Sequence, residues 1–294
     1  MIVSASYRTD IPAFYGSWFA RRLAAGYAMV ANPYGGPPYR VGLTPETASG
    51  FVFWTRNAGP FLPQFEAVRA LGLPFMVQFT LTAYPRGLEA SVPPAATAIG
   101  QIQALARRYG PRAVVWRYDP VLLGSETDAA FHRAGFARLA AALSGAVDEV
   151  CISFAQIYAK TRRNLERAAQ RHGFAWRDPA LEEKRRLRAE LEAIANAHGM
   201  RLSVCAQADI GGRGAVCVDA GRLSDVAGHR VGGRRKGNRP DCLCVESRDI
   251  GAYDTCPHGC VYCYAVTSRH RAQARFKAHD PASEFLLTPA PAGR

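Results

Sequence analysis

The sequence predicts an α/β protein, a (β/α) TIM-like barrel of parallel strands with a cysteine-rich segment that caps it. Three observations favour this fold class. Short apolar runs alternate with longer amphipathic segments of helical period as far as residue 206. The chain of 294 residues is 48% hydrophobic, which is enough to bury a sizeable core. Polar residues follow successive apolar runs, as they do at the carboxyl ends of barrel strands.

The first half of this pattern ends at residue 81. The apolar run at its start predicts a buried strand, and the spacing of Phe14, Trp18 and Phe19 predicts the helix that follows. A stretch rich in turn residues, 32–38, interrupts the pattern. We expect strands over residues 1–6, 27–31, 50–54 and 75–81, and helices over residues 11–25 and 61–71.

The second half repeats the alternation from residue 95 to residue 206. We expect helices over residues 95–108, 128–143 and 180–197, a further helical pattern that ends at residue 171, and strands over residues 113–118, 149–154 and 201–206. Strands that alternate with helices of this length form a parallel sheet with the helices packed outside it. Seven such units close most economically into a barrel, and an open doubly wound sheet is the alternative.

The character of the chain changes after the last predicted strand. Glycine-rich stretches at 211–214 and 228–239 are typical of loops. We therefore expect three parts: a barrel over residues 1–206, a cysteine-rich metal-cluster segment over residues 207–287 that closes the barrel mouth, and a disordered tail over residues 288–294.

Composition limits the compartment and the partners that we expect. No apolar run approaches the length of a membrane span, so we expect a cytoplasmic protein without a membrane partner. In that reducing compartment, eight cysteines favour metal ligands over disulfides. The formal net charge of +13, with basic stretches at 160–171 and 229–239, is compatible with a nucleic-acid partner. A solvated basic surface is the alternative.

Three cysteines near the C-terminus have a specific spacing. Cys256, Cys260 and Cys263 form a C-x3-C-x2-C motif. A tight loop of this kind presents three thiolates to one side of a 4Fe–4S cluster and leaves the fourth iron free to bind a small molecule. Zinc and disulfides are the alternatives, although zinc sites usually combine C-x2-C pairs. His258 inside the loop is either a ligand, a proton donor or a residue that shapes the turn.

Four further cysteines form a second group. They are Cys205 at the end of the last predicted strand, Cys217, and the pair Cys242 and Cys244. Together they suit a second iron–sulfur cluster or a zinc ion. Alternatively, one of the pair is the fourth ligand of the first cluster, or all four are unligated. Cys151 lies inside an apolar strand, so we expect it in the core.

Polar side chains at the predicted strand ends are candidates for binding substrate and cofactor, because the carboxyl ends of barrel strands hold the active site. Arginine and aspartate side chains there suit a charged small molecule. The candidate catalytic residues are Arg8, Asp10, Arg117, Tyr118 and Asp119, and the candidate cofactor-binding residues are Asn57, Thr82, Gln156, Lys160 and Tyr262. Asp10 precedes Ile11 and Pro12, so it also has the features of a helix N-cap.

Four stretches resemble a bacterial family known as a domain of unknown function. They are SYRTDIP at 6–12, FWTRN at 53–57, WRYDP at 116–120 and DIGAYDTC at 249–256, and the resemblance covers nearly the whole chain. That family carries at its C-terminus a cysteine cluster similar to the one that radical S-adenosylmethionine enzymes carry near their N-terminus. The resemblance implies a 4Fe–4S cluster on the C-x3-C-x2-C loop, with S-adenosylmethionine chelating the free iron. In a closed barrel, the loop after the last strand would lie over residues 8–10.

These observations lead to three functional hypotheses. The first is a radical S-adenosylmethionine-like enzyme with a charged small-molecule substrate and an external electron donor. The second is an iron–sulfur redox enzyme that does not use S-adenosylmethionine. It is favoured by the spare cysteines and by Gly35-Gly36, which Pro37 follows in place of an acidic residue. The third is a nucleic-acid-binding or repair protein with a metal site.

Overall fold

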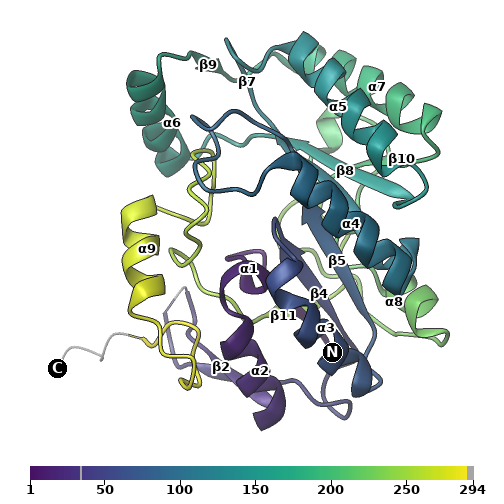
Figure 1. The fold of residues 1–294 in the computed structure, drawn as a ribbon, viewed down its shortest axis with the longest axis vertical. Helices are drawn as coiled ribbons and strands as arrows, with labels where there is room; N and C mark the ends of the chain where they lie inside the picture. The colour runs from purple at the N-terminus through teal and green to yellow at the C-terminus, as the bar shows by residue number, and fades with distance from the viewer. Residues whose placement is uncertain (34, 290–294) are drawn as a thin grey trace.

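The centre of the computed structural model, which describes residues 1–33 and 35–289, is a sheet of seven parallel strands (Figure 1). In spatial order the strands are β10 (Arg201–Val204), β8 (Glu149–Phe154), β6 (Val114–Val121), β5 (Phe75–Thr80), β4 (Gly50–Thr55), β1 (Ile2–Ala5) and β11 (Ser247–Asp249). The predicted α/β class is therefore confirmed. Residues 290–294 of the predicted disordered tail lie outside the described residues.

The order of the strands is that of a singly wound sheet. From β1 to β10, each strand of the sheet lies beside the one before it. A doubly wound sheet would reverse this order at a switch point, whereas a barrel would not. In the described part of the chain no pairing joins β10 to β11, so closure of the predicted barrel is not detected.

One predicted strand lies outside this sheet. Residues 27–31 were expected in the barrel, but β2 (Tyr27–Val30) pairs antiparallel with β3 (Tyr39–Gly42) in a separate hairpin. The described residues of the short connection between the two form no helix, and a parallel crossover needs a dozen residues or more. The seventh strand of the main sheet is instead β11, which the sequence analysis did not predict. A second small sheet pairs β7 (Leu123–Gly124) with β9 (Trp176–Arg177).

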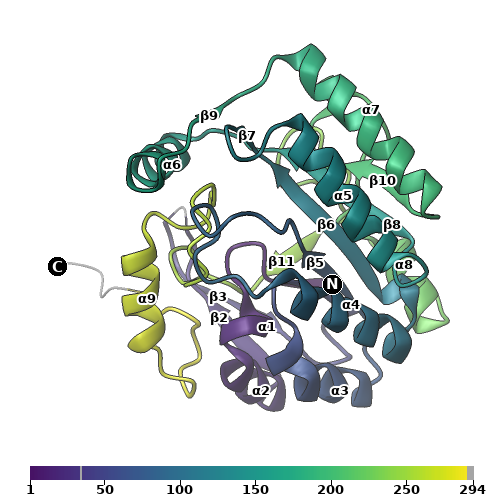
Figure 2. The same ribbon diagram turned by 45° about the horizontal axis from the view of Figure 1, so that its top comes forward.

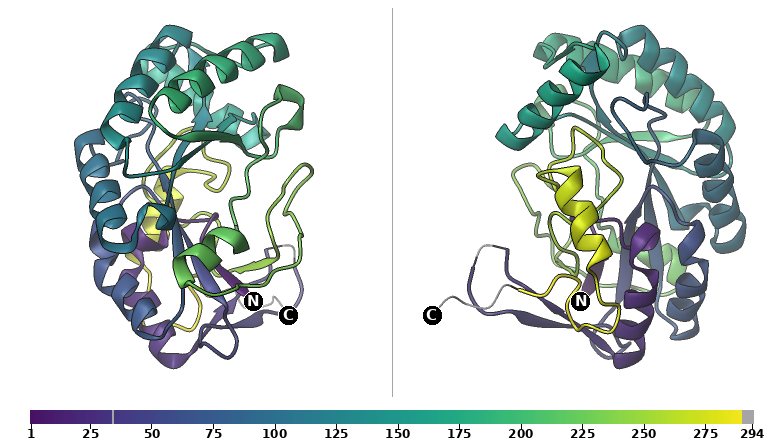
Figure 3. Two further views of the ribbon diagram at one scale, coloured as in Figure 1. Left: turned by 90° about the vertical axis from the view of Figure 1, so that its right-hand side faces the viewer. Right: turned by 60° about the vertical axis from the view of Figure 1, so that its left-hand side comes forward.

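Most helices lie along one face of the sheet, as right-handed crossovers require. Figures 2 and 3 show this outer layer, which includes α2 (Gly16–Ala25), α3 (Leu62–Ala70), α4 (Ala95–Tyr109), α5 (Ala129–Leu143) and α7 (Leu181–Ala197). The remaining helices are α1 (Ile11–Phe14), α6 (Ala159–His172), α8 (Ala220–Ala227) and α9 (Arg269–Lys277), with 3₁₀ turns at Gly59–Phe61, Pro111–Ala113 and Ala208–Ile210. Among the described residues, none of the helices has both the length and the apolar character needed to span a bilayer.

The two faces of the sheet have different coverings, because successive strand residues point to opposite sides. On the outer face, Phe53 packs against Phe61 and Phe65 of the helical layer. On the inner face, Val52 belongs to a second apolar cluster with Val218. The chain after β10 therefore covers the inner face, and Figure 3 shows it in green on the side opposite the outer helices.

Candidate functional site

A cavity of about 1020 Å³ lies at the carboxyl ends of the parallel strands. Its wall consists of residues in or directly after β1, β4, β5, β6, β8 and β10, of residues from the β2–β3 hairpin and of residues from the C-terminal segment. The cysteines in this wall are Cys205, Cys217, Cys242, Cys244, Cys256, Cys260 and Cys263. Both cysteine groups predicted from the sequence thus line one cavity.

Strand β11 brings the C-x3-C-x2-C loop to this cavity. It pairs with β1 so that Ser4 lies opposite Asp249. The buried Asp249 carboxylate accepts hydrogen bonds from Ser4 Oγ at 2.8 Å and Ser6 Oγ at 2.7 Å. It also accepts one from the Tyr7 N–H at 3.0 Å. Residues 8–10 therefore lie beside the cysteine loop, because the edge strand β11 pairs with β1.

Asp10 connects the first strand to the cysteine loop. Its Oδ1 accepts hydrogen bonds from Ala13 N (2.9 Å) and Thr55 Oγ1 (2.7 Å), which confirms the predicted N-cap of α1. Its Oδ2 accepts from Arg56 N and from His258 Nε2, both at 2.8 Å. With two hydrogen bonds on each oxygen, this carboxylate holds the loop in place. His258 accordingly shapes the loop through this contact.

A buried polar network lies behind the loop. Arg56 Nη1 donates to Glu89 Oε1 at 2.7 Å, and Arg56 Nη2 donates to the Tyr262 hydroxyl at 2.6 Å. Thr82 Oγ1 donates to the same Glu89 oxygen at 2.5 Å, and Tyr262 also bonds to it. Burial raises the pKa of Tyr262, so its hydroxyl stays protonated. Sequence reasoning missed Glu89, because it lies in a loop that has no periodic pattern.

The three cysteines of the loop are half-buried, and Cys260 and Cys263 lie close to the Arg56 guanidinium. Burial raises the pKa of Cys260 to about 12, and the Arg56 guanidinium acts in the opposite direction. Burial also raises the pKa values of Cys256 and Cys263. The sulfurs of the three are not all within 4.8 Å of one another, unlike those of the second group below.

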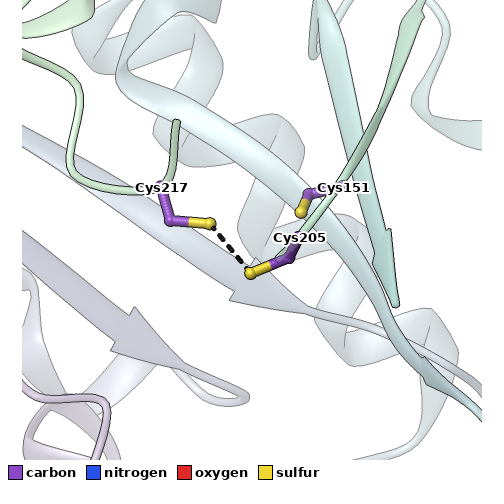
Figure 4. Close-up of side chains that lie close together, drawn as sticks. All are labelled: Cys151, Cys205 and Cys217. Atoms are coloured by element: carbon purple, nitrogen blue, oxygen red, sulfur yellow. Dashed lines mark hydrogen bonds between the residues drawn. The ribbon is translucent and has the colours of Figure 1, made fainter. Parts of the chain in front are cut away.

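The second group of cysteines is more compact and includes one that we expected in the core. The sulfurs of Cys151, Cys205 and Cys217 all lie within 4.8 Å of one another, so this group could hold a metal ion. Figure 4 shows the three side chains converging, with Cys217 Sγ 3.6 Å from Cys205 Sγ. Cys151 is buried, as predicted, but it points to the inner face of β8. Its neighbour across the β8–β10 pair is Ser203, two residues before Cys205.

Two arginines contact these sulfurs. Arg117 Nη1 donates to Cys217 Sγ at 3.0 Å and to Cys151 Sγ at 3.5 Å. Arg239 Nη2 donates to Cys205 Sγ at 3.2 Å. Hydrogen bonds from neighbouring thiols, with a smaller contribution from Arg117, lower the pKa of Cys217. A hydrogen bond from Cys244 lowers the pKa of Cys242 to about 5. Cys217 and Cys242 therefore favour the thiolate, which is the form that binds metal ions. Hydrogen bonds with Cys205 and Cys217 instead raise the pKa of Cys151. The hydrogen bond with Cys151 acts to lower the pKa of Cys205, but the one with Cys217 and burial raise it to about 11.

The candidate catalytic residues separate into two sets. Arg8, Arg117 and Asp119 line the cavity with Asp10, and Arg117 forms an ion pair with Asp119. Tyr118 does not belong with them, because the strand alternation turns it to the outer face, where its hydroxyl bonds to His132 Nδ1 at 2.8 Å. We therefore correct the expectation for Tyr118 and assign it to the core.

The candidate cofactor-binding residues also separate. Gln156, Lys160 and Tyr262 line the cavity. Asn57 instead faces α4, where its Oδ1 accepts a hydrogen bond from Gln101 at 2.8 Å. Thr82 is buried in the network with Glu89 described above. Direct contact with a cavity ligand is therefore supported for the first three and not for Asn57 or Thr82.

Comparison with known proteins identifies the family. The family model described as "Domain of unknown function (DUF1848)" matches residues 2–265, so the chain belongs to this family. The match contains every strand of the main sheet and both cysteine groups. No curated protein matches the chain.

Proposed function

We propose that this member of the DUF1848 family is an iron–sulfur enzyme that acts on a charged small molecule. In this proposal Cys256, Cys260 and Cys263 hold a 4Fe–4S cluster in the wall of the cavity. One observation carries it: a loop with three cysteines lines a cavity of about 1020 Å³ together with arginine, lysine and aspartate side chains. Parallel-sheet enzymes bind their ligands at this end of the strands.

The cluster supplies electrons and one iron that lacks a cysteine ligand. The resemblance of the loop to that of radical S-adenosylmethionine enzymes supports S-adenosylmethionine as the molecule at that iron, with reduction by an external electron donor. The residues of the chain itself hold the loop and limit its contact with water. Asp10 fixes His258, and the buried pair of Arg56 and Glu89 fixes Tyr262 beside Cys260.

Unpaired polar groups support a ligand in the cavity. Arg8 and Thr9 both line it, and Thr9 Oγ1 is a buried atom without a hydrogen-bond partner in the described structure. Arg8 Nε makes no hydrogen bond either, although it lies 3.8 Å from Asp249 Oδ1 in an ion pair. Buried donors and acceptors of this kind are costly unless something bonds to them. A ligand in the cavity would supply that partner.

The charges of the wall favour an anionic substrate. Arg56, Arg117 and Lys236 each pair with a carboxylate. Among the described residues, Lys160 lines the cavity without a carboxylate oxygen within 4.0 Å of its charged nitrogen. Arg239 also lacks such a carboxylate, but it donates a hydrogen bond to Cys205 Sγ. Positive charge that is not neutralised by the protein attracts phosphate or carboxylate groups.

The use of S-adenosylmethionine is tested by spectroscopy of the reduced protein. We expect that anaerobically reconstituted protein gives a 4Fe–4S electron paramagnetic resonance signal after reduction, that S-adenosylmethionine shifts this signal, and that the cofactor is cleaved. An unchanged signal without cleavage would contradict the role of S-adenosylmethionine and favour the iron–sulfur enzyme that does not use it. Methionine serves as the matched control, because it has the same chelating groups but no sulfonium.

A further inference from the structure

The compact cysteine group forms a second site whose geometry differs from that of the C-terminal loop. We propose that Cys151, Cys205 and Cys217 bind one soft divalent metal ion, with zinc as the preferred ion, and that the fourth coordination position of this ion faces the cavity. This inference goes beyond the proposed function and does not depend on it, because none of the three cysteines belongs to the C-x3-C-x2-C loop.

The separation of the sulfurs favours a single ion over a cluster. A tetrahedral zinc ion has Zn–S bonds of about 2.3 Å, which places its thiolates roughly 3.8 Å apart. Cys205 Sγ and Cys217 Sγ are 3.6 Å apart, and all three sulfurs lie within 4.8 Å of one another. Cysteines that bind different irons of a cube are separated further. The loop cysteines do not belong to the group whose sulfurs all lie within 4.8 Å of one another.

The fold positions the three thiols on rigid elements. Cys151 lies within β8, and Cys205 directly follows the neighbouring strand β10. Cys217 comes from the segment that packs on the inner face. That segment is held along β10 by two backbone hydrogen bonds, from Val204 N to Arg213 O at 2.7 Å and from Ala215 N to Val204 O at 2.8 Å. Metal sites require such fixed ligands.

The surrounding charges fit a thiolate site. Three thiolates and one divalent ion have a net charge of about −1. Arg117 donates hydrogen bonds to Cys151 and Cys217, and Arg239 donates one to Cys205. Donors to the ligand atoms orient them and offset their charge. Apolar core cysteines would not require guanidinium groups at their sulfurs.

The fourth coordination position points to the cavity because of how the three ligands are arranged. Cys205 and Cys217 line the cavity, whereas Cys151 lies behind them in the sheet. Cys244 is close to Cys217, but it does not belong to the group whose sulfurs lie within 4.8 Å. Three protein ligands with an open fourth position are typical of zinc sites that bind exogenous ligands. A thiolate-rich ion favours soft donors, so we expect a thiol there.

Metal analysis of single variants tests the site. We expect about one zinc per chain in the anaerobically purified full-length protein. Zinc should fall at least tenfold in Cys205→Ser and in Cys217→Ser. The matched control Cys244→Ser, which changes a cysteine in the same cavity wall, should keep its zinc, as should the Cys256→Ala, Cys260→Ala, Cys263→Ala triple variant. Circular dichroism confirms that each variant is folded.

The open position is tested with cobalt. Co²⁺ added to the zinc-depleted triple variant should give thiolate-to-cobalt absorption, and 2-mercaptoethanol should shift the visible cobalt bands. If the zinc content were unchanged in both Cys205→Ser and Cys217→Ser, the single-ion site would be overturned. A lower sulfide content in these two variants would also overturn it, because it would indicate a cluster. Loss of zinc in Cys244→Ser, or cobalt bands that do not respond to the thiol, would overturn the open position.

Discussion

At the scale of single residues, hydrogen-bond geometry distinguishes residues that hold the site from residues that contact its ligand. Asp10, a catalytic candidate from sequence, uses both carboxylate oxygens to hold α1, Arg56 and His258. Arg8 keeps a buried nitrogen without a hydrogen-bond partner among the described residues, and it lines the cavity. Asp10 and Arg8 were both predicted as catalytic residues, but their hydrogen bonds indicate that Asp10 holds the site and that Arg8 faces the ligand.

Replacing Asp10 by Asn tests its role in holding the cysteine loop. An amide can still cap α1, but its nitrogen cannot accept the hydrogen bonds from Arg56 and His258. We expect the free energy of unfolding to fall by about 1–3 kcal/mol and the iron content to fall with it. Asp128→Asn is the matched control, since Asp128 caps α5 through a single contact to Phe131 N. Equal effects of the two variants in urea denaturation would contradict the account.

The buried His132 predicts how stability depends on pH. Burial lowers its pKa to about 4, below the unfolded value near 6.5, so the unfolded chain binds the proton more readily. The contribution of His132 to the free energy of unfolding is fully present above pH 6.5. As the pH falls toward 4, the free energy of unfolding decreases by about 3 kcal/mol. Thermal unfolding of His132→Gln should show a flatter dependence between these pH values. The exposed His270→Gln should keep the wild-type profile, and a wild-type profile in His132→Gln would contradict the assignment.

At the scale of the elements, the strand β11 decides where the cysteine loop lies. Its three residues, Ser247–Asp249, contain no apolar run, so periodicity could not identify it. The β2–β3 hairpin shows the opposite case, because the apolar run at 27–30 resembles a buried strand until its partner is known. Long helices and fully apolar strands were predicted correctly, since their patterns do not depend on a distant partner.

Gly251, directly after this strand, allows the close contact between β11 and β1. A Cβ at this position would lie 2.0 Å from Ser6 Oγ and 2.5 Å from Ser6 Cβ. We expect Gly251→Ala to lower the free energy of unfolding by about 1–3 kcal/mol, because the two strands must move apart. Gly100→Ala in α4, where a Cβ meets nothing within 4 Å, should be neutral or stabilising by up to about 1 kcal/mol. A Gly251→Ala protein as stable as Gly100→Ala would contradict this packing.

The alternation of strand residues also explains which site residues the sequence could reveal. Applied to β6 and β8, a period of two places Arg117, Asp119 and Cys151 on the inner face and Tyr118 on the outer one. This alternation is visible in the sequence, and it could have assigned Cys151 to the second cysteine group. Glu89 and Arg239, by contrast, lie on loops whose positions depend on tertiary contacts.

At the scale of the whole molecule, one cavity joins parts of the chain that are far apart in sequence. The strand ends contribute the charged residues, and the segment after β10 contributes most of the cysteines. Part of the positive charge that suggested a nucleic-acid partner is neutralised within the stretch 229–239, because Arg234 and Lys236 both form ion pairs with Glu246. A nucleic-acid partner stays a prediction from composition, whereas the cavity supports a small molecule.

The most direct test of the central claim is anaerobic iron and sulfide analysis of the purified protein beside the Cys256→Ala, Cys260→Ala, Cys263→Ala triple variant. The account predicts about four irons and four sulfides per chain, lost in the triple variant. Cys205→Ser should retain them, because its cysteine belongs to the other group. Stoichiometric zinc without sulfide in the wild-type protein, or iron and sulfide that persist in the triple variant, would contradict a 4Fe–4S cluster on this loop.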